Sequence, residues 1–489
     1  MKSQEAFVLR KLRLLLQEKA KLNPKTHNNT TTQNNNQIEK FKTPKTYYTH
    51  IIYPVTPLSQ NNYAPLIGDN YAPDKIQVII PVGGKATRLL PLTAETSKAC
   101  LRLLNRPLVE FTLLQLAKQG IRQFIFGVKG YTNYRDLHDY FESGIGFSAR
   151  YNIKPRIHIK YQPNVEDIGS ADSARINIDY YNINTPILAI QGDNIFDINV
   201  KELIQYHKDK DATMTIVLRE VQNVEGLGIA DIDKTGCIKG FIEKPQPTDA
   251  PSNLANTGLY VLSPGIKKVF NEEGVKQIKE QKKRLDFGYD FIPYLTQTRH
   301  PVYGYTLKGN WYDVGTPKNY LQAMKKLLNG GFSLLTDFGG RISEKQPVWV
   351  QGESTDSEKV RQQIIKKIKQ RKITIEGAVL IGRHCYIEDG ARIANSCIDH
   401  YTRIGKDVAI ENSAIMDRTI IGSCTEIADS IIGRHVNIRS SKQNPTLISN
   451  VSVIGDDVTL EEGCQLEATK IYPHQQIRGE FQHQTVMKA

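Results

Sequence analysis

The chain has 489 residues, 39% hydrophobic and 24% charged, a composition that excludes a disordered or fibrous protein and allows two or more domains. Its formal net charge is +13. Residues 1–75 and residues 358–372 each contribute +6, so all the other residues together carry only +1. Because the basic charge is confined to two segments and forms no aromatic-interleaved face, we expect no nucleic-acid partner.

The sequence also argues against a membrane or secreted protein. No stretch approaches the ~18 to 20 consecutive apolar residues of a membrane span, so we expect no transmembrane segment. Charged residues interrupt positions 1–20, unlike the apolar centre of a secretory signal. The six cysteines include no Cys-x-x-Cys pair and are typical of reduced thiols. These features predict a cytoplasmic protein.

Residues 1–74 form an extension before the first predicted domain. Residues 5–22 have apolar side chains at helical spacing, which predicts an amphipathic helix suited to docking, to self-association or to a membrane surface. Residues 23–36 are rich in asparagine and threonine and are typical of disorder. Residues 47–73 are rich in proline, tyrosine and asparagine and predict a linker.

Residues 75–330 alternate between short apolar runs, typical of buried strands, and helical patterns. Strands are predicted at 77–81, 123–128, 157–161, 186–191, 213–219 and 258–262, and helices at 107–118 and 171–180. This alternation predicts an α/β, Rossmann-like domain, in which helices cover both faces of a mostly parallel sheet.

From residue 373 the pattern changes to an isoleucine repeat. Successive isoleucines from Ile375 to Ile438 are five or six positions apart, and from Ile381 onwards three consecutive spacings add up to 17. After an insertion at 440–449 the rhythm resumes. Such hexads stack one apolar side chain on each face of a coil. The repeat predicts a left-handed parallel β-helix over residues 373–480, preceded by a basic helical linker at 331–372.

The segment after the first predicted strand carries glycines and cations. Gly83 and Gly84 follow the strand directly, Thr87 and Arg88 lie in the next loop, and Lys98 follows one loop later. Glycines allow main-chain N–H groups to approach an anion, and nearby cations neutralise its charge. The segment predicts a phosphate site at the carboxyl end of the strand; a tight turn is the alternative for the glycine pair alone.

Two aspartates occupy comparable places further along the chain. Asp193 follows a predicted buried strand in the motif QGDN, and Asp313 lies beside a glycine in the motif WYDVGTP. Mg²⁺ prefers one or two carboxylates together with phosphate oxygens. The two aspartates therefore predict one Mg²⁺ site, and for either residue alone the alternative is an aspartate that caps a turn.

Further residues have the chemistry of a sugar-phosphate site. Glu243 and Lys244 place an acceptor for hydroxyls beside a cation for a phosphate, although a surface ion pair is the alternative. Asn256 and Thr257 precede Gly258 at the start of another predicted strand, which is consistent with a wall against a flat sugar.

In this order the motifs resemble those of the sugar-1-phosphate nucleotidyltransferases, also called nucleotide-sugar pyrophosphorylases. The resemblance covers residues 75–327 and five motifs: the glycine loop with TRL, PLT and Lys98, then GD, EKP, NTGLY and WYDVGTP. It implies an enzyme that uses Mg²⁺ to join an NTP and a sugar 1-phosphate, giving an NDP-sugar and pyrophosphate. Such in-line attack on the α-phosphorus requires no nucleophilic side chain.

The resemblance also implies a role for each matching residue. The nucleotide would contact Gly83, Gly84, Thr87, Gln162 and Gly169, the last two as the pair that reads the base. The catalytic cations would be Arg88 and Lys98, and the Mg²⁺ ligands would be Asp193 and Asp313. The sugar phosphate would contact Gly228, Glu243, Lys244, Asn256 and Thr257.

The sequence departs from the family pattern in the glycine loop. Ala86 stands where the family usually has glycine, so the loop is less free to adopt a positive φ, and Ser97-Lys98-Ala99 replaces Pro-Lys-Pro. The Ser-Lys, GDNIF and NTGLY segments are similar to glucose-1-phosphate thymidylyltransferases, whereas WYDVGTP and the tail are more like guanylyl- and adenylyltransferases. We therefore expect dTTP and glucose 1-phosphate, ahead of mannose-1-phosphate guanylyl transfer or glucose-1-phosphate adenylyl transfer.

A binding protein is the alternative to an enzyme. The same two-domain plan resembles regulatory subunits of the eukaryotic translation-initiation guanine-nucleotide exchange factor. The discriminating feature is a full set of cations and carboxylates, which favours catalysis: Arg88, Lys98, Asp193, Lys244 and Asp313.

The isoleucine-repeat tail raises a separate question. Hexapeptide β-helices also occur in acyltransferases, for which His384, His400 and His435 are the candidate bases. Each histidine is placed in a turn or an outward position, where a solvated side chain is the usual explanation. We expect the tail to build a homo-oligomer or to carry regulation.

Overall fold

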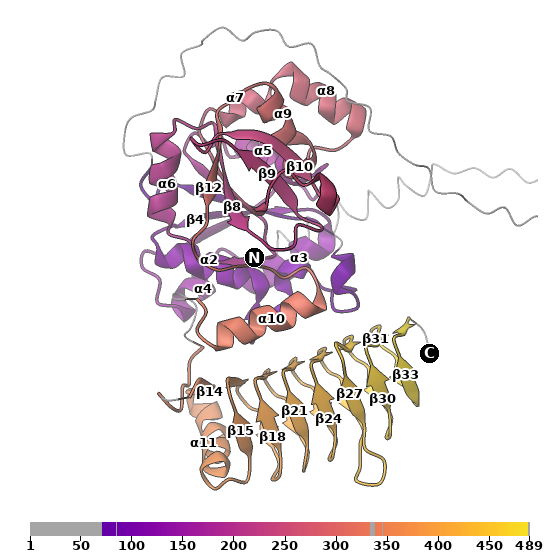
Figure 1. Cartoon of the computed structure of the whole chain (residues 1–489). Helices are drawn as coiled ribbons and strands as arrows, with labels where there is room; N and C mark the ends of the chain where they lie inside the picture. The colour runs from indigo at the N-terminus through magenta and orange to yellow at the C-terminus, as the bar shows by residue number, and fades with distance from the viewer. Residues whose placement is uncertain (1–70, 85, 333–337, 345, 488–489) are drawn as a thin grey trace, which may run out of the picture. The chain divides into compact units, whose positions relative to one another are not determined.

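A computed structural model describes residues 71–84, 86–332, 338–344 and 346–487. The helix predicted at 5–22 and the two segments that follow it lie outside the described residues. Two architectures follow one another in the described chain: an α/β domain and then a succession of short parallel strands (Figure 1).

The α/β domain is built on a nine-stranded sheet. Its parallel part has the order β6-β1-β4-β5, with bounds Ile187–Ile190, Gln77–Val82, Gln123–Val128 and His158–Tyr161. Beyond β6 the sheet continues with β11 (Leu254–Leu262), which runs antiparallel to β6, β8 and β9. The other strands are β8 (Met214–Glu220), β9 (Gly228–Ile232), β10 (Ile238–Glu243) and β12 (Val302–Thr306). The Rossmann-like sheet is confirmed, with an antiparallel extension.

Helices cover both faces of this sheet because the side chains of each buried strand alternate between two cores. Val78 and Ile80 of β1 belong to one core and Ile79 to the other. The first core includes α2 (Leu108–Lys118), α3 (Tyr131–Phe141), α4 (Ile145–Arg150), α6 (Val200–Asp209) and α10 (Pro317–Leu328). The second includes α5 (Ser170–Tyr180), α7 (Ile266–Phe270), α8 (Glu273–Lys282) and α9 (Ile292–Gln297).

Short elements at the carboxyl edge of the parallel strands carry most of the predicted site. β7 (Asn194–Phe196) pairs antiparallel with β13 (Trp311–Asp313), which places Asp313 opposite Asn194. Single helical turns lie at η2 (Thr87–Leu89), η3 (Lys98–Cys100) and η4 (Pro247–Asp249), and η5 (Phe287–Phe291) is a π-helix. β2 (Arg102–Leu103) and β3 (Arg106–Pro107) form a two-stranded hairpin.

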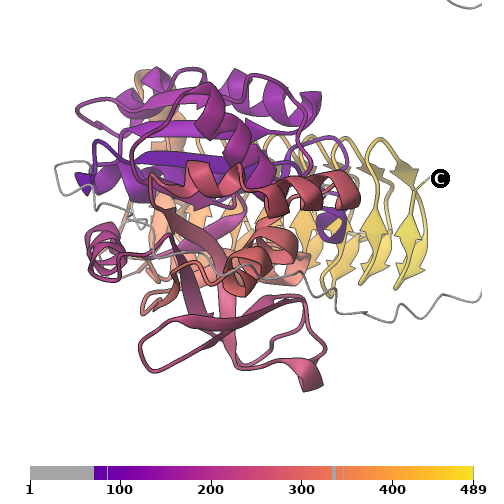
Figure 2. The same ribbon diagram turned by 90° about the horizontal axis from the view of Figure 1, so that it is seen from above.

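The tail forms three parallel sheets whose rungs follow the isoleucine repeat. Ile381, Ile398 and Ile415 are direct register partners in one sheet, so each full coil of the chain matches one period of the repeat. Successive coils, orange to yellow in Figure 2, follow one another along one axis, and each coil contributes a strand to each sheet. A parallel β-helix is therefore confirmed.

The strands of the β-helix fall into three series. The first is β14 (Val348–Val350), β16 (Val379–Ile381), β19 (Cys397–Ile398), β22 (Ala414–Ile415), β25 (Ile431–Ile432), β28 (Val453–Ile454), β31 (Lys470–Ile471) and β34 (Thr485–Val486). The second is β15 (Thr374–Glu376), β18 (Arg392–Ala394), β21 (Ala409–Glu411), β24 (Glu426–Ala428), β27 (Leu447–Ser449), β30 (Gln465–Glu467) and β33 (Glu480–Gln482). The third is β17 (Tyr386–Ile387), β20 (Arg403–Ile404), β23 (Ile420–Ile421), β26 (Asn437–Ile438), β29 (Thr459–Leu460) and β32 (Gln476–Ile477). Helix α11 (Thr355–Lys369) lies between β14 and β15.

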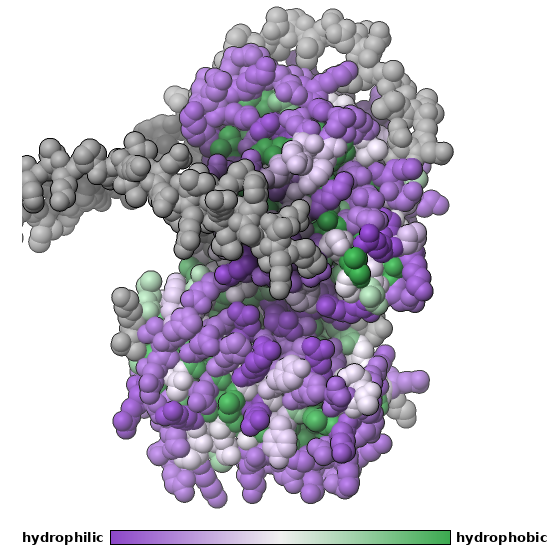
Figure 3. Space-filling model, turned by 180° about the vertical axis from the view of Figure 1, so that it is seen from behind, coloured by the Kyte–Doolittle hydropathy of each residue, from purple (hydrophilic) through white to green (hydrophobic). Residues whose placement is uncertain are grey.

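The face of the described chain shown in Figure 3 is mainly hydrophilic. On this face, apolar residues are scattered among hydrophilic ones. In the part of the chain that the structure describes, every helix is too short or too polar to cross a membrane.

Candidate active site

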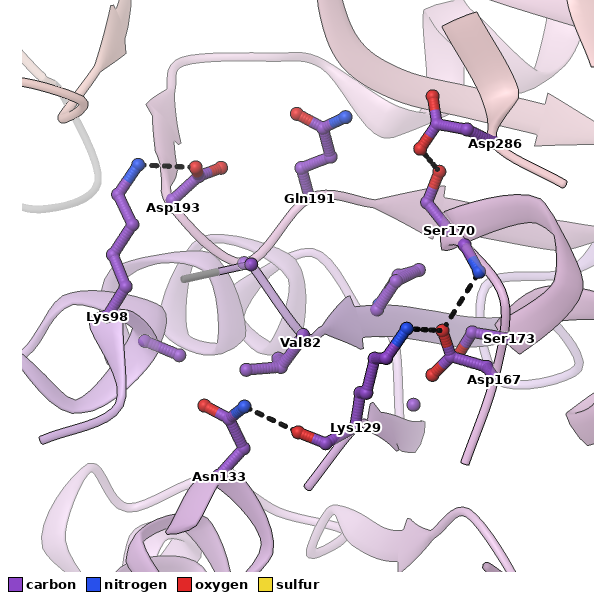
Figure 4. Close-up of a pocket in the computed structure, with 17 residues that line it drawn as sticks. Val82, Lys98, Lys129, Asn133, Asp167, Ser170, Ser173, Gln191, Asp193 and Asp286 are labelled. Atoms are coloured by element: carbon purple, nitrogen blue, oxygen red, sulfur yellow. Dashed lines mark hydrogen bonds and ion pairs between the residues drawn. The ribbon is translucent and has the colours of Figure 1, made fainter. Parts of the chain in front are cut away.

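A cavity of about 350 Å³ opens at the carboxyl edge of β1, β4 and β6, where ligands bind in open α/β sheets. Its walls come from the ends of these strands and from the loops that follow them (Figure 4). The lining includes Gly83, Gly84, Lys98, Lys129, Asn133, Asp167, Gly169, Ser170, Gln191, Asp193 and Asp286. The glycine loop, Asp193 and Gly169, singled out from the sequence, therefore meet at one cavity.

The glycine loop is shaped by close contacts. A Cβ atom added to Gly83 would lie 2.7 Å from the Cβ of Lys129, so only glycine fits there without displacing that side chain. A Cβ on Gly84 would meet no atom within 4 Å. Thr87 begins the single turn η2 and is exposed. Gly83 therefore serves close packing, and Gly84 presents open backbone to the cavity.

Ala86, which stands where the family usually has glycine, nevertheless adopts a positive φ. Its φ is 46° and its ψ is 39°, in the left-handed region. Its carbonyl accepts hydrogen bonds from the hydroxyl of Thr93 at 3.0 Å and from the backbone N–H of Leu89 at 2.9 Å. This conformation costs an L-residue with a Cβ about 1–2 kcal/mol.

We expect Ala86→Gly to stabilise the domain. Glycine adopts this φ without strain, and after its greater freedom in the unfolded chain is subtracted, a gain of about 1 kcal/mol is left, or about 2–4 °C in Tm. The control is Ala94→Gly at an exposed position of the same loop with an ordinary φ, which should lower Tm. Differential scanning calorimetry measures both, and shifts of the same sign would contradict the strain argument.

Two carboxylates and two cations meet beside the loop, and we name Arg88, Lys98, Asp193 and Asp313 the charge cluster. The Lys98 ammonium lies 2.5 Å from a carboxylate oxygen of Asp193 and 3.8 Å from one of Asp313. The Arg88 guanidinium lies 3.8 Å from the other Asp313 oxygen. Burial, followed by the nearby Asp193 carboxylate, raises the pKa of Asp313, and Lys98 and Arg88 oppose this rise.

The charge cluster has the donors that a magnesium ion accepts. In the described parts of the chain, no group of three or more His, Cys, Asp and Glu side chains converges on one point. Asp193 and Asp313 nevertheless share the Lys98 ammonium, so both carboxylates can reach one cation. Two carboxylates completed by substrate phosphates and water form the coordination set typical of Mg²⁺.

Glu243 and Lys244 lie at the end of β10, and glycines enclose the carboxylate. Glu243 is the register partner of Gly228, and a Cβ on Gly228 would lie 2.5 Å from its Oε2. A Cβ on Gly288, from the η5 helix, would lie only 2.2 Å from the same atom. The Lys244 ammonium lies 3.8 Å from Oε1 of Glu243 and 5.2 Å from the centre of the Tyr289 ring. The two glycines thus make room for a carboxylate that is only 16% exposed.

Burial raises the pKa of Glu243 from 4.5 to about 7, although Lys244 opposes the shift. The folded protein therefore holds this proton more tightly than the unfolded chain does. The stability contributed by the group is fully present below about pH 4.5 and is lost as pH rises through about 7.

We expect Glu243→Gln to remove this pH dependence, since glutamine keeps the shape without the charge. The stability of the variant relative to wild type should rise by about 2 kcal/mol between pH 5 and pH 8. Tm values at both pH values measure the difference. Glu220→Gln, at the exposed end of β8, is the control and should track wild type. A Glu243→Gln curve parallel to wild type would show that Glu243 keeps an ordinary pKa.

Some residues predicted for the site have side chains engaged elsewhere. The Gln162 side-chain oxygen accepts from Ser173 at 2.7 Å and from Asn177 at 3.0 Å, and its amide donates to the Asn164 carbonyl at 3.0 Å. Gln162 is only 4% exposed and lies behind the cavity wall.

The NTGLY residues are likewise tied into the sheet. Asn256 accepts from the Gly258 N–H at 2.9 Å and donates to the Tyr260 hydroxyl at 2.8 Å. The Thr257 hydroxyl donates to the Val217 carbonyl at 2.8 Å. Both side chains therefore hold β11 in shape.

Other cavity residues were missed from the sequence. Asp286 accepts from the Ser170 hydroxyl at 2.7 Å and from the Gly288 N–H at 3.0 Å, and it caps η5. Lys129 and Asp167 face each other across 3.9 Å at the end of the cavity away from Asp193 (Figure 4). Lys129 directly follows the strand 123–128. The rule that ligands bind at the carboxyl ends of parallel strands, which indicated Gly83 and Asp193, could therefore have indicated Lys129 as well.

The geometry agrees with comparisons with known proteins. The family model described as nucleotidyl transferase matches residues 77–330. The chain belongs to the nucleotidyl transferase family. A second model, described as the GMPPB C-terminal domain, matches residues 375–487, which are the β-helix of this nucleotidyltransferase.

Named relatives of this nucleotidyltransferase differ in their substrates. A glucose-1-phosphate adenylyltransferase of Fervidobacterium nodosum is 29% identical over 409 residues, 79% of this chain and 92% of the relative. A mannose-1-phosphate guanyltransferase of Debaryomyces hansenii is 26% identical over 84% of this chain and 99% of its own. A UTP–glucose-1-phosphate uridylyltransferase of Synechocystis is 26% identical over 74% and 88%.

The three candidate histidines of the β-helix all have partners. His384 stacks on Tyr401 with ring centres 4.8 Å apart. His400 accepts from the Arg383 N–H at 3.1 Å, and burial lowers its pKa to about 4. His435 lies 3.2 Å from Asp457. These contacts explain the three histidines as structural residues of the β-helix surface.

Proposed function

We propose that the protein transfers the nucleotidyl group of an NTP to a sugar 1-phosphate and releases pyrophosphate. The observation that carries this proposal is the charge cluster beside the glycine loop. Two cations and two carboxylates at the carboxyl edge of the sheet suit a substrate with many phosphate charges. Glu243 and Lys244 provide a second, smaller acceptor–cation pair for the other substrate.

The reaction is an in-line displacement at the α-phosphorus. An oxygen of the sugar phosphate forms a bond to the α-phosphorus while the bond to the oxygen bridging the α- and β-phosphates breaks. Pyrophosphate leaves with that electron pair. Lys98 and Arg88 stabilise the charge that develops, and the backbone at Gly83 and Gly84 holds the phosphates. Positioning and electrostatic stabilisation account for the catalysis, so no covalent intermediate is required.

Mg²⁺ is the cofactor we propose, with Asp193 and Asp313 as its protein ligands. When bound, it neutralises charge on the phosphate oxygens. On the sugar side, Glu243 accepts hydrogen bonds from sugar hydroxyls, and Lys244 pairs with the phosphate. The Glu243 carboxylate lies between Gly228 and Gly288, and the Lys244 ammonium lies 3.8 Å from it.

An enzyme is favoured over a regulatory binding protein because all four residues of the charge cluster are present. A protein that only binds has no need for two carboxylates held against one lysine at 2.5 and 3.8 Å. Lys244 also contributes to the electrostatic field at Asp313, so all five discriminating residues act on one region.

Pyrophosphate release tests the proposal. Purified protein with Mg²⁺ is assayed against ATP, GTP, UTP and dTTP, each with glucose 1-phosphate and with mannose 1-phosphate. Turnover of at least one pair supports the proposal. Absence of turnover in every combination, with the protein folded by circular dichroism, would contradict it. The same panel also tests the sequence-based expectation of dTTP against the other nucleotides.

A further inference from the structure

The cavity has two ends, and each carries one lysine and one aspartate. Lys98 and Asp193 lie at one end, where the proposed function places the phosphates, and Lys129 and Asp167 lie at the other (Figure 4). The glycine loop connects the ends, since Gly83 lies against the side chain of Lys129. A nucleotide whose phosphates occupy the first end therefore directs its base towards Lys129 and Asp167.

Asp167 is a carboxylate with unused acceptor capacity. Its side chain is 6% exposed. It accepts from the Gly169 N–H at 3.0 Å, and the Gln162 amide also stabilises its charge. A carboxylate has about four acceptor positions, so two of them are left for a ligand. Burial raises the pKa of Asp167, as expected for a charge that lacks part of its hydration.

Lys129 supplies a donor beside that acceptor. Its backbone is fixed at the end of β4, because its N–H donates to the Val82 carbonyl at 2.8 Å and its carbonyl accepts from Asn133 at 2.6 Å. Its side chain is 47% exposed, and the ammonium lies 3.9 Å from Asp167. At that distance the two groups are paired electrostatically without a hydrogen bond.

Gln162, which the resemblance implies as a reader of the base, is not available for this role. Its side-chain oxygen already accepts two hydrogen bonds, and its amide donates to the Asn164 carbonyl and stabilises the Asp167 carboxylate. The polar side chains that line this end of the cavity are Lys129, Asn133, Asp167, Ser170, Ser173 and Asp286, and Asp286 is already engaged by the Ser170 hydroxyl at 2.7 Å.

We propose that this end of the cavity reads guanine, with Asp167 as the specificity-determining residue. The inference rests on the proposed nucleotidyl transfer. Guanine presents two adjacent donors, N1–H and the N2 amino group, which match the two free acceptor positions of a carboxylate. Its O6 acceptor lies next to N1–H, where the Lys129 ammonium can donate. Adenine, uracil and thymine each present one Watson–Crick donor next to acceptors, which a carboxylate repels.

Inosine triphosphate isolates the contact, because it differs from GTP only by the missing N2 amino group. A hydrogen bond to a charged group contributes about 1.5–3 kcal/mol, so wild-type kcat/KM for GTP should exceed that for ITP at least tenfold. GTP should also exceed ATP, UTP and dTTP. Asp167→Asn should reduce the GTP/ITP ratio to within about threefold of unity, since the amide accepts at one oxygen and carries no charge.

Two further variants separate base reading from general effects. Glu166→Gln, an exposed neighbour of Asp167, should keep the wild-type GTP/ITP ratio. Lys129→Met should lower activity with GTP and ITP by the same factor, because both nucleotides carry O6. A Lys129→Met variant that lowered activity equally with all nucleotides would indicate that Lys129 contacts the phosphates. That result would contradict its proposed contact with O6 of guanine.

The inference and the proposed function can fail separately. A wild-type enzyme that turns over ATP, UTP or dTTP better than GTP, or GTP and ITP equally, overturns guanine reading and leaves nucleotidyl transfer intact. If no sugar phosphate in the panel is accepted, calorimetric titration of wild type with GTP and ITP decides the inference alone. Tighter binding of GTP by at least tenfold supports it, and equal binding overturns it. These wild-type comparisons do not depend on the folding of any variant.

Discussion

Asp193→Asn should reduce kcat for pyrophosphate release by about three orders of magnitude. The carboxylate lies 2.5 Å from Lys98 and lines the cavity, and we propose it as one of two protein ligands of Mg²⁺. Asparagine keeps the shape and removes the charge. A bound metal contributes several kcal/mol of charge stabilisation in the transition state, and about 1.4 kcal/mol corresponds to a factor of ten in rate.

The matched control for this variant is Asp231→Asn, at an exposed position of β9. It makes the same chemical change in the same domain and should retain full activity. Measurement over a range of Mg²⁺ concentrations adds a second readout, because Asp193→Asn should require more metal for half-maximal rate. Unchanged turnover and unchanged metal dependence in Asp193→Asn would refute the metal assignment.

Gly288→Ala should lower kcat/KM for the sugar 1-phosphate by two to three orders of magnitude. The new Cβ would lie 2.2 Å from Oε2 and 2.8 Å from Cδ of Glu243, so the carboxylate has to move out of its position. A misplacement of about 1 Å in a site can cost about a hundredfold, and loss of a charged hydrogen bond adds to this. The φ of Gly288 is not positive, so alanine is tolerated by the backbone itself.

Two companion variants show whether Glu243 is the cause. Gly228→Ala crowds the same oxygen from the other side, at 2.5 Å, and should give a similar loss. Gly240→Ala lies on the same strand as Glu243, but its Cβ would meet its nearest atom at 3.7 Å, so it should behave as wild type. KM for the NTP should change little in all three. An active Gly288→Ala enzyme with ordinary KM for the sugar phosphate would show that Glu243 does not hold the sugar.

Much of the fold was predictable because local pattern and global packing agree. The isoleucines of the tail repeat predict their own register partners, and Ile381 does pair with Ile398. Gly83 and Asp193 were located because each lies within three residues of the end of a buried parallel strand, and the carboxyl ends of such strands meet at one edge of the sheet. The antiparallel strands β9 and β10 were not predicted, since their apolar residues alternate over only a few positions.

The rest of the site depends on contacts between distant segments. Asp286 reaches the cavity only because the Leu285 carbonyl accepts the N–H groups of Ala171 and Asp172, which lie far earlier in the chain. The sequence of η5 contains no periodic signal for that contact. Gln162 illustrates the opposite case, because its position in the motif is as predicted while its side chain turns inward to Ser173. The direction of a side chain in an irregular loop is set by tertiary packing.

The segment from Leu285 to Gly288 connects the two halves of the site. At one end the Leu285 carbonyl holds the start of helix α5, next to Gly169 at the proposed nucleotide end of the cavity. At the other end Gly288 packs against the Glu243 carboxylate. Any shift of this segment on nucleotide binding therefore reaches Glu243, the proposed sugar acceptor, within a few residues. Thermodynamic linkage makes such coupling reciprocal: the factor by which the nucleotide changes the affinity for the sugar phosphate equals the factor in the reverse direction.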